Sequence, residues 1–145
     1  MRYTHFGLHA GDPAKGEKGI SIFPERRTEF RESVFSALDY AEVVGIKMIH
    51  AMAGVLPPSK RSHYHWELLH RKLSLCCSGG KSRGIRIIVE PMSGSAVPDC
   101  FIATPDRAAH AIAETGGGDI GILLDLFTRR TLVWTLRSRL KSMAS

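Results

Sequence analysis

The sequence predicts an α/β fold in which parallel strands alternate with helices. Continuous apolar runs, rich in Ile and Val, alternate along the chain with amphipathic helical patterns, which is typical of parallel strands that are covered on both faces. His50, Glu90 and Asp125 stand at or near the ends of three successive runs, 40 and 35 residues apart. In parallel α/β folds this edge of the sheet is where ligands bind, so the same pattern predicts a site.

Four apolar runs are the candidate strands. They read "HFGLHA", "IKMIHAMAG", "IRIIVEP" and "IGILLDLF" in chain order. The first is the weakest, and the last three have the uninterrupted apolar character of strands buried on both faces.

Helical patterns lie between these runs. Residues 27–44 and 62–77 repeat apolar side chains at steps of three and four, which predicts two helices with one apolar stripe each. Gly45 ends the first helix, and the stretch "SGGKSRG" behind the second predicts a loop. Thr104 as N-cap and Pro105 in the first turn mark the start of a third helix.

The repeat length bears on the architecture. A unit of about 35 residues suits a (β/α)8 barrel, which needs roughly 200 residues or more. The 145 residues of this chain therefore hold about half of one. An open, doubly wound sheet fits the length better, but such a sheet usually carries a glycine-rich phosphate turn after its first strand, and "GDPAKGEKG" is no G-x-G-x-x-G.

Composition limits the class of protein. Hydrophobic content of 43% and charged content of 23% are values of globular proteins. No apolar run approaches the roughly 20 residues of a membrane helix, and the first residues lack the apolar core of a signal peptide. We therefore expect a soluble, cytoplasmic protein with no membrane partner.

The net charge of +6 is unevenly distributed. No acid follows Asp125, and without the five cations beyond it the balance falls to 15 − 14 = +1. The basic character therefore belongs to the end of the chain and not to its body, which disfavours nucleic acid as the partner. The five cations are Arg129, Arg130, Arg137, Arg139 and Lys141.

Glu90 and Asp125 suggest a metal-assisted reaction. Two carboxylates on neighbouring strands can converge on one hard divalent cation, Mg²⁺ or Mn²⁺. Such a cation polarises a carbonyl or enolate oxygen, while a carboxylate beside it moves a proton between adjacent carbons. This chemistry is that of an aldose–ketose isomerisation. The alternative is that both acids cap helices or pair with arginines, and their spacing leaves both interpretations open.

Two further positions have alternative interpretations. His50, inside "MIHAMAG", is either a residue of the core or rim, or a ligand. Glu17 lies in the long glycine-rich loop "GDPAKGEKG", which is either a lid over the site or a plain connection. In a lid, Lys15 and Lys18 would meet an anionic substrate.

Several pieces of the sequence resemble one known family. They are the loop "GD..KGE.G", the strand end "H.MAG", the strand end "VEP" with the following "FIATP", and the strand "LLDLF". Over residues 6–127 the chain is similar to the hydroxypyruvate isomerase family, whose members are sugar-isomerase-like TIM barrels related in fold to xylose isomerase and endonuclease IV. The resemblance implies an α/β fold that is a partial (β/α)8 TIM barrel, with about four β-α units of a xylose-isomerase-like barrel.

The resemblance also implies an activity. The family interconverts hydroxypyruvate and tartronate semialdehyde, or related 2-oxo acids of four-carbon sugars, through an enediolate and usually with a divalent metal such as Mg or Mn. It implies that Glu90 is a metal ligand and the catalytic proton donor and acceptor, and that Asp125 is a second metal ligand. It places His50, Asp12 and Glu17 around the substrate, which is a small 2-oxo acid or sugar acid.

The chain also departs from the family pattern. "LDLF" is normally followed by His, where Thr128 stands here, and nothing beyond it matches the later glutamine ligand and second glutamate. We therefore expect two parts, a partial isomerase-like barrel over 1–128 and a basic helix or tail over 129–145. A truncated member with impaired activity is the resulting prediction. The alternatives are a non-catalytic remnant that forms homo-oligomers, and a 2-oxo-tetronate isomerase or other sugar isomerase or epimerase.

Overall fold

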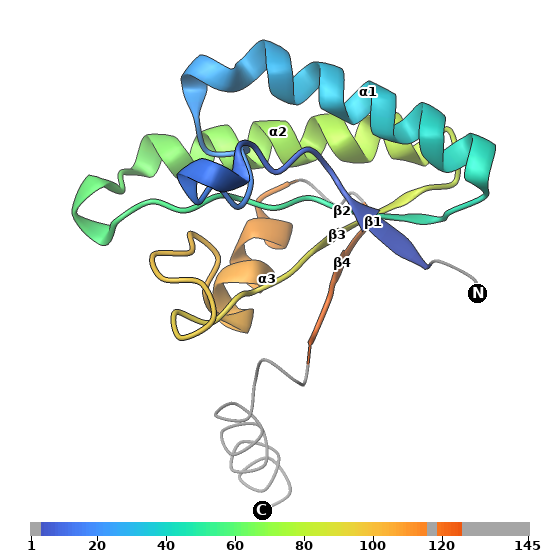
Figure 1. The fold of residues 1–145 in the computed structure, drawn as a ribbon. Helices are drawn as coiled ribbons and strands as arrows, with labels where there is room; N and C mark the ends of the chain where they lie inside the picture. Colours follow the sequence, from blue (N-terminus) through green and yellow to red (C-terminus); the bar gives the residue numbers. More distant parts are fainter. Residues whose placement is uncertain (1–3, 116–118, 126–145) are drawn as a thin grey trace, which may run out of the picture.

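The four candidate strands form one parallel sheet with helices packed along its outer side (Figure 1). The computed structural model describes residues 4–115 and 119–125. Strands lie side by side in chain order, as in a barrel, whereas a doubly wound sheet reverses its order at a switch point. The partial-barrel prediction is therefore confirmed. The strands are β1 (His5–Gly7), β2 (Met48–His50), β3 (Arg86–Val89) and β4 (Ile120–Ile122).

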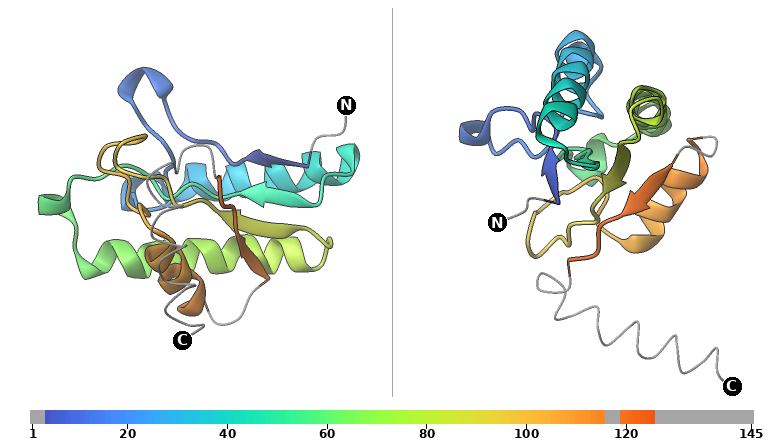
Figure 2. Two further views of the ribbon diagram at one scale, coloured as in Figure 1. Left: turned by 90° about the horizontal axis from the view of Figure 1, so that it is seen from below. Right: turned by 90° about the vertical axis from the view of Figure 1, so that its right-hand side faces the viewer.

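Three α-helices connect the strands and cover the sheet on one side. In Figure 2 they follow the curve of the sheet as an outer arc. The first ends at Gly45, which adopts a left-handed conformation with φ 77°, and the third begins at Thr104, whose side chain accepts a hydrogen bond from the Arg107 N–H; both ends were predicted. The helices are α1 (Arg27–Val44), α2 (His63–Lys81) and α3 (Pro105–Ala113), with short 3-10 turns η1 (Pro13–Lys15), η2 (Pro24–Arg26) and η3 (Pro58–Lys60).

The main core lies between the sheet and the helices. Phe6, Ile49, Ile87 and Ile120 are register partners across the four strands, so their side chains share one face of the sheet. Ile49 and Ile87 are fully buried, and Phe6 and Ile120 pack partly buried at the two edges of the same cluster. The opposite face carries the neighbouring positions, which include His50.

The prediction of a loop at "SGGKSRG" is wrong at its start, because α2 continues to Lys81. Two glycines in its last turns allow close packing instead of ending the helix. A Cβ at Gly80 would lie 2.4 Å from the Ile85 carbonyl oxygen, and one at Gly79 would lie 2.7 Å from a Leu38 methyl group. Close approach to Ile85, just before β3, and to Leu38 of α1 therefore explains both glycines.

The prediction that the last run is buried on both faces is also wrong. Ile120 and Gly121 are half-buried, and Ile122 is exposed. Among the described residues β4 has a strand neighbour on one side only, so part of its surface stays open. The predicted boundary after residue 128 and the basic segment 129–145 lie outside the described residues. Within the described part of the chain, no helix is both long and apolar enough to span a membrane.

Candidate functional site

His50 and Glu90 come together at the carboxyl ends of two neighbouring strands. His50 pairs in register with Ile88, and Glu90 lies two residues beyond Ile88. Because side chains alternate between the two faces of a strand, His50 and Glu90 point to the same face. Their Nδ1 and Oε2 atoms are 3.9 Å apart, and the two side chains are only 9% and 17% exposed.

The imidazole of His50 is held in its neutral form. Burial, together with a smaller effect of His5 on the adjacent strand, lowers its pKa from 6.5 to about 4. A neutral ring at 3.9 Å from Glu90 is a neighbour of the carboxylate and not its salt-bridge partner. The Nε2 atom is buried without a hydrogen-bond partner in the described part of the chain.

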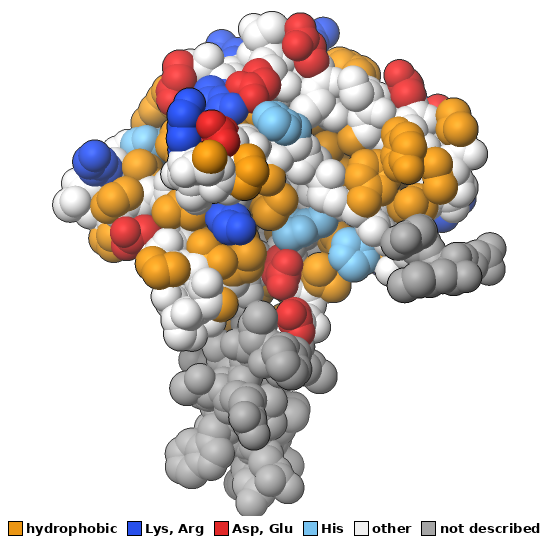
Figure 3. Space-filling view, viewed as in Figure 1, with side chains coloured by type: hydrophobic (Ala, Val, Ile, Leu, Met, Phe, Trp, Pro, Cys, Tyr) orange, Lys and Arg blue, Asp and Glu red, His pale blue; other side chains and the backbone are white. Residues whose placement is uncertain are grey.

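Asp125 stands at the end of the next strand. β4 pairs with β3 through Ile88 and Gly121, and the Leu123 N–H extends the ladder by donating to the Val89 carbonyl at 2.9 Å. Asp125 is half-buried and lies four residues beyond Gly121, the register partner of Ile88. Side-chain alternation therefore places Asp125 on the same face of the sheet as Ile88 and Glu90. Acidic and histidine side chains gather on the face seen in Figure 3.

The described residues contain no group of three His, Cys, Asp or Glu side chains arranged to hold a metal ion. Glu90 and Asp125 are two carboxylates just beyond the ends of the adjacent strands β3 and β4. Carboxylate oxygens are the hard ligands that Mg²⁺ and Mn²⁺ prefer.

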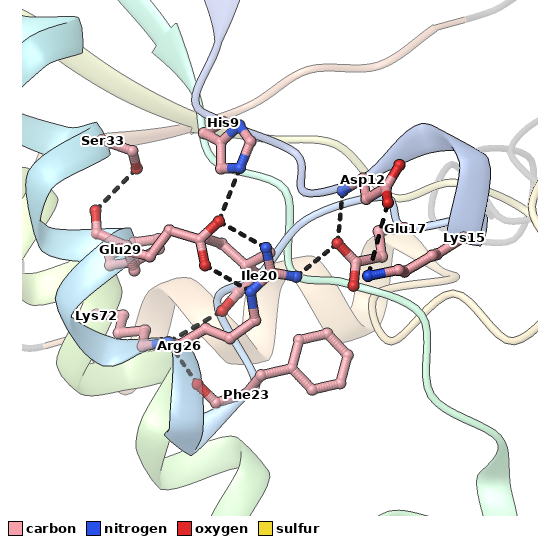
Figure 4. Close-up of polar contacts among 11 residues, drawn as sticks. His9, Asp12, Lys15, Glu17, Ile20, Phe23, Arg26, Glu29, Ser33 and Lys72 are labelled. Atoms are coloured by element: carbon pink, nitrogen blue, oxygen red, sulfur yellow. Dashed lines mark hydrogen bonds and ion pairs between the residues drawn. The ribbon is translucent and has the colours of Figure 1, made fainter.

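Asp12 and Glu17 lie in the loop after β1, where the Asp12 backbone binds Glu17 and Glu17 in turn binds a neighbouring arginine (Figure 4). The Asp12 N–H donates to Glu17 Oε2 at 2.6 Å, and the Asp12 side chain accepts from the Ala14 N–H at 2.9 Å. Arg26 Nη1 donates to the same Glu17 oxygen at 2.5 Å. Arg26 lowers the pKa of Glu17, so this carboxylate is charged at neutral pH.

The sequence did not single out Arg26, nor Glu29 and His9 beside it. Arg26 Nε and Nη2 each donate to Glu29 at 2.6 Å, and His9 Nε2 lies 2.9 Å from the same carboxylate. The only signal in the sequence was the Arg-x-x-Glu spacing at a helix start, which is common on helix surfaces. What distinguishes this pair is Glu17, which the loop brings in from nine residues before Arg26.

The loop is fixed to the end of β2, close to His50. Gly19 has φ +113°, and a Cβ there would lie 2.3 Å from the Met52 carbonyl oxygen. Ser21 Oγ donates to the same oxygen at 2.8 Å. Lys72, buried in α2, donates from Nζ to the carbonyl oxygens of Ile20 and Phe23 at 2.9 Å each.

Comparison with known proteins identifies the type of barrel. The chain is 28% identical over 127 residues to the hydroxypyruvate isomerase of Escherichia coli K12, covering 88% of this chain and 49% of that protein. It is 27% identical over 122 residues to the 2-oxo-tetronate isomerase of Cupriavidus necator, covering 84% of this chain and 47% of that protein. The chain thus spans about half the length of the curated relatives it matches.

The fold itself has solved counterparts. A crystal structure described as AP endonuclease, family 2, from Brucella melitensis superimposes with a TM-score of 0.82 at 24% identity, covering 93% of this chain and 54% of that one. The sequence model of the family described as "Xylose isomerase-like TIM barrel" matches residues 5–128. With a consecutive parallel sheet, outer helices and acids at its strand ends, the chain belongs to the xylose isomerase-like TIM barrel family.

Proposed function

We propose that the site serves the isomerisation of a small 2-oxo acid, with hydroxypyruvate and tartronate semialdehyde as the substrate pair. The observation that carries this proposal is the half-buried Glu90 beside a neutral His50, 3.9 Å apart at the strand ends. Support comes from the relatives named hydroxypyruvate isomerase and 2-oxo-tetronate isomerase, which share 27–28% of aligned residues.

Glu90 is proposed as the group that moves the proton. Its carboxylate removes a proton from the hydroxyl-bearing carbon C3 of hydroxypyruvate, which leaves an enediolate across C2 and C3. Returning the proton to C2, while the proton of the C3 hydroxyl passes to the C2 oxygen, gives tartronate semialdehyde, so the atoms and the overall oxidation state are unchanged. His50, neutral and with Nε2 unpaired among the described residues, is proposed to hydrogen-bond a substrate oxygen without adding a charge.

A divalent cation, Mg²⁺ or Mn²⁺, is proposed as the cofactor. Glu90 and Asp125 would hold it, since both carboxylates lie on the same alternation of adjacent strands. When bound, such a cation stabilises the negative charge that develops on the enediolate oxygens. These two residues leave coordination positions for water, substrate or further side chains.

The loop of Asp12 and Glu17 is proposed as one wall of the substrate site. It follows β1 and is fixed to Met52, two residues beyond His50, so it lies at the edge of the sheet where the proposed chemistry occurs. Glu17 already binds Arg26, so its effect on substrate is proposed to come through the shape of the loop. A location in the cytoplasm stays a prediction.

The half-reaction gives the sharpest test. Hydroxypyruvate is incubated with the chain and Mn²⁺ or Mg²⁺ in D₂O, and deuterium entering C3 is followed by NMR. Proton removal by Glu90 predicts enzyme-dependent exchange that Glu90→Gln abolishes, whereas Glu67→Gln, a change at an exposed acid of α2, leaves it intact. Exchange that survives in Glu90→Gln contradicts the assignment, and absence of exchange in the unaltered chain contradicts the proposed activity for this chain.

Metal binding is tested separately. If Glu90 and Asp125 hold the cation, Mn²⁺ raises the melting temperature of the unaltered chain, and Asp125→Ala removes the rise. A rise that persists in the variant places the cation elsewhere.

Self-association is a second candidate role, favoured by the open side of β4. Ile122 and Leu124 are 37% and 47% exposed, and exposed apolar side chains at an edge strand promote association. Sedimentation velocity tests this role. Oligomers that dissociate in Leu124→Lys support it, and a monomer at all concentrations contradicts it.

A further inference from the structure

We propose that Arg26 is a positioning residue that locks loop 11–19 in one conformation, so that the loop is a fixed wall and not a lid. Calling it a wall of the active site rests on the proposed function. The locked state itself is a property of the free chain and is measurable without substrate or metal.

The lock begins with the way Arg26 uses its guanidinium group. Nε and Nη2 donate to the two carboxylate oxygens of Glu29 at 2.6 Å each, and Nη1 donates to Glu17 Oε2 at 2.5 Å. Glu29 belongs to the first turn of α1, so one side of the fork is anchored to a helix. The other side holds the loop by charge-assisted bonds, with the Arg26 and Glu17 side chains only 21% and 23% exposed.

Glu17 closes the loop on itself at the same point. Its Oε2 atom also accepts from the Asp12 N–H at 2.6 Å, so one oxygen joins the start of the loop, its end and Arg26. Gly11 makes this approach possible: it has φ +91°, and a Cβ there would lie 2.1 Å from Glu17 Oε2. The glycine before Asp12 is thus explained by the position of the carboxylate.

The remainder of the segment is held by other means. The Gly19 N–H donates to the Ala10 carbonyl at 2.8 Å, and the Ile22 N–H donates to the Ala53 carbonyl at 3.2 Å. Lys72 of α2 donates hydrogen bonds from Nζ to the carbonyl oxygens of Ile20 and Phe23. The lock is therefore the main tie of the middle of the loop to α1, and its removal is expected to free that part without freeing residues 20–23.

A matched control exists at the other end of α1. Arg83 Nη1 also binds two acids, Asp39 at 2.5 Å and Glu42 at 2.9 Å, and its side chain is 26% exposed. Arg83→Met therefore removes an arginine with a similar set of partners and similar exposure. It does so far along the chain from loop 11–19.

The test is amide hydrogen exchange of the free chain at neutral pH, compared among Arg26→Met, Glu17→Gln and Arg83→Met. Because local opening sets the exchange rate, we expect the Asp12 amide to exchange at least about tenfold faster in the first two variants. Peptides covering β2, β3 and residues 20–23 keep their protection, and Arg83→Met leaves the loop unchanged. Cleavage by trypsin after Lys15 and Lys18 rises in parallel in Glu17→Gln, which retains every tryptic site.

Further outcomes decide the inference. Arg26→Lys keeps the positive charge but not the planar guanidinium group, so loop 11–19 keeps only part of its protection. In Arg26→Ala, added methylguanidinium is expected to restore part of the lost protection of the loop. Unchanged exchange of loop 11–19 in both Arg26→Met and Glu17→Gln overturns the proposal. Loss of protection throughout the sheet in both variants overturns it too, because Arg26 would then support the whole fold. Protection that depends on Arg26 in a chain that shows no deuterium exchange into hydroxypyruvate upholds the lock while refuting the proposed activity.

Discussion

His50 Nδ1 lies 3.9 Å from Glu90 Oε2, although the two residues are separated by 40 positions in the sequence. The parallel pairing of β2 with β3 brings them together, since His50 is the register partner of Ile88. The histidine is neutral because it is buried, so the carboxylate beside it is not neutralised by a cationic ring. A carboxylate in that state suits the removal of a proton from carbon.

The neutral state of His50 predicts a pH dependence of stability. Its pKa falls from 6.5 in the unfolded chain to about 4 in the folded chain, so the unfolded chain binds the extra proton first. The stabilisation is complete above pH 6.5 and declines as the pH falls toward 4, by roughly 3 kcal/mol in all. Urea unfolding at pH 7 and pH 4.5 measures this loss, and His50→Gln is expected to remove it. An NMR titration midpoint near 6.5 would contradict burial of the ring.

The acids bound to Arg26 predict a second, more acidic dependence. Hydrogen bonds from Arg26 lower the pKa of Glu29 to about 2 and also lower that of Glu17. A lowered pKa of an acid contributes stability above its ordinary value of 4.5 and loses it as the pH falls through the folded value. His9, Asp12 and Lys15 are the other titratable groups of this cluster.

The measurement is the protection of loop 11–19 below pH 4.5, after correction for the intrinsic pH dependence of exchange. Protection that declines on acidification in the unaltered chain, and is low at every pH in Glu17→Gln, agrees with the lock. A profile that is identical in both proteins contradicts it.

Close packing at the end of α2 predicts the effect of a single methyl group. Gly80→Ala places a Cβ only 2.4 Å from the Ile85 carbonyl oxygen, so the helix or the segment before β3 must shift. Overpacking of this kind costs about 1–3 kcal/mol of unfolding free energy. Gly94→Ala is the control, because a Cβ there meets nothing within 4 Å, and equal stability of the two variants would show that Gly80 is not in close contact.

The core facing the helices predicts a larger loss. Ile87 is 1% exposed at the centre of the sheet, and its truncation in Ile87→Ala leaves a cavity that costs about 2–5 kcal/mol. Val43→Ala at the 87% exposed surface of α1 is expected to change stability by less than about 0.5 kcal/mol. Chemical denaturation of both variants measures the difference, and similar values would place Ile87 outside the core.

The sequence predicted the elements well because their signals are local. The stripe of α1, its end at Gly45 and the start of α3 at Thr104 depend on neighbouring residues of the same segment. The two errors arise where distant residues decide. Gly79 and Gly80 lie within α2, where Leu38 of α1 and Ile85 just before β3 approach them closely. β4 is partly open because it lacks a second strand neighbour among the described residues.

The sequence by itself determined the alternation of strands and helices, the parallel sheet and the acids at the strand ends, since periodicity and caps are properties of short segments. Only the tertiary structure showed that His50 is a buried, neutral neighbour of Glu90, because burial and register depend on strands that are far apart in sequence. Only the tertiary structure showed that Glu17 is held by Arg26 and the Asp12 N–H, because a single arginine fork joins the loop to the first turn of α1.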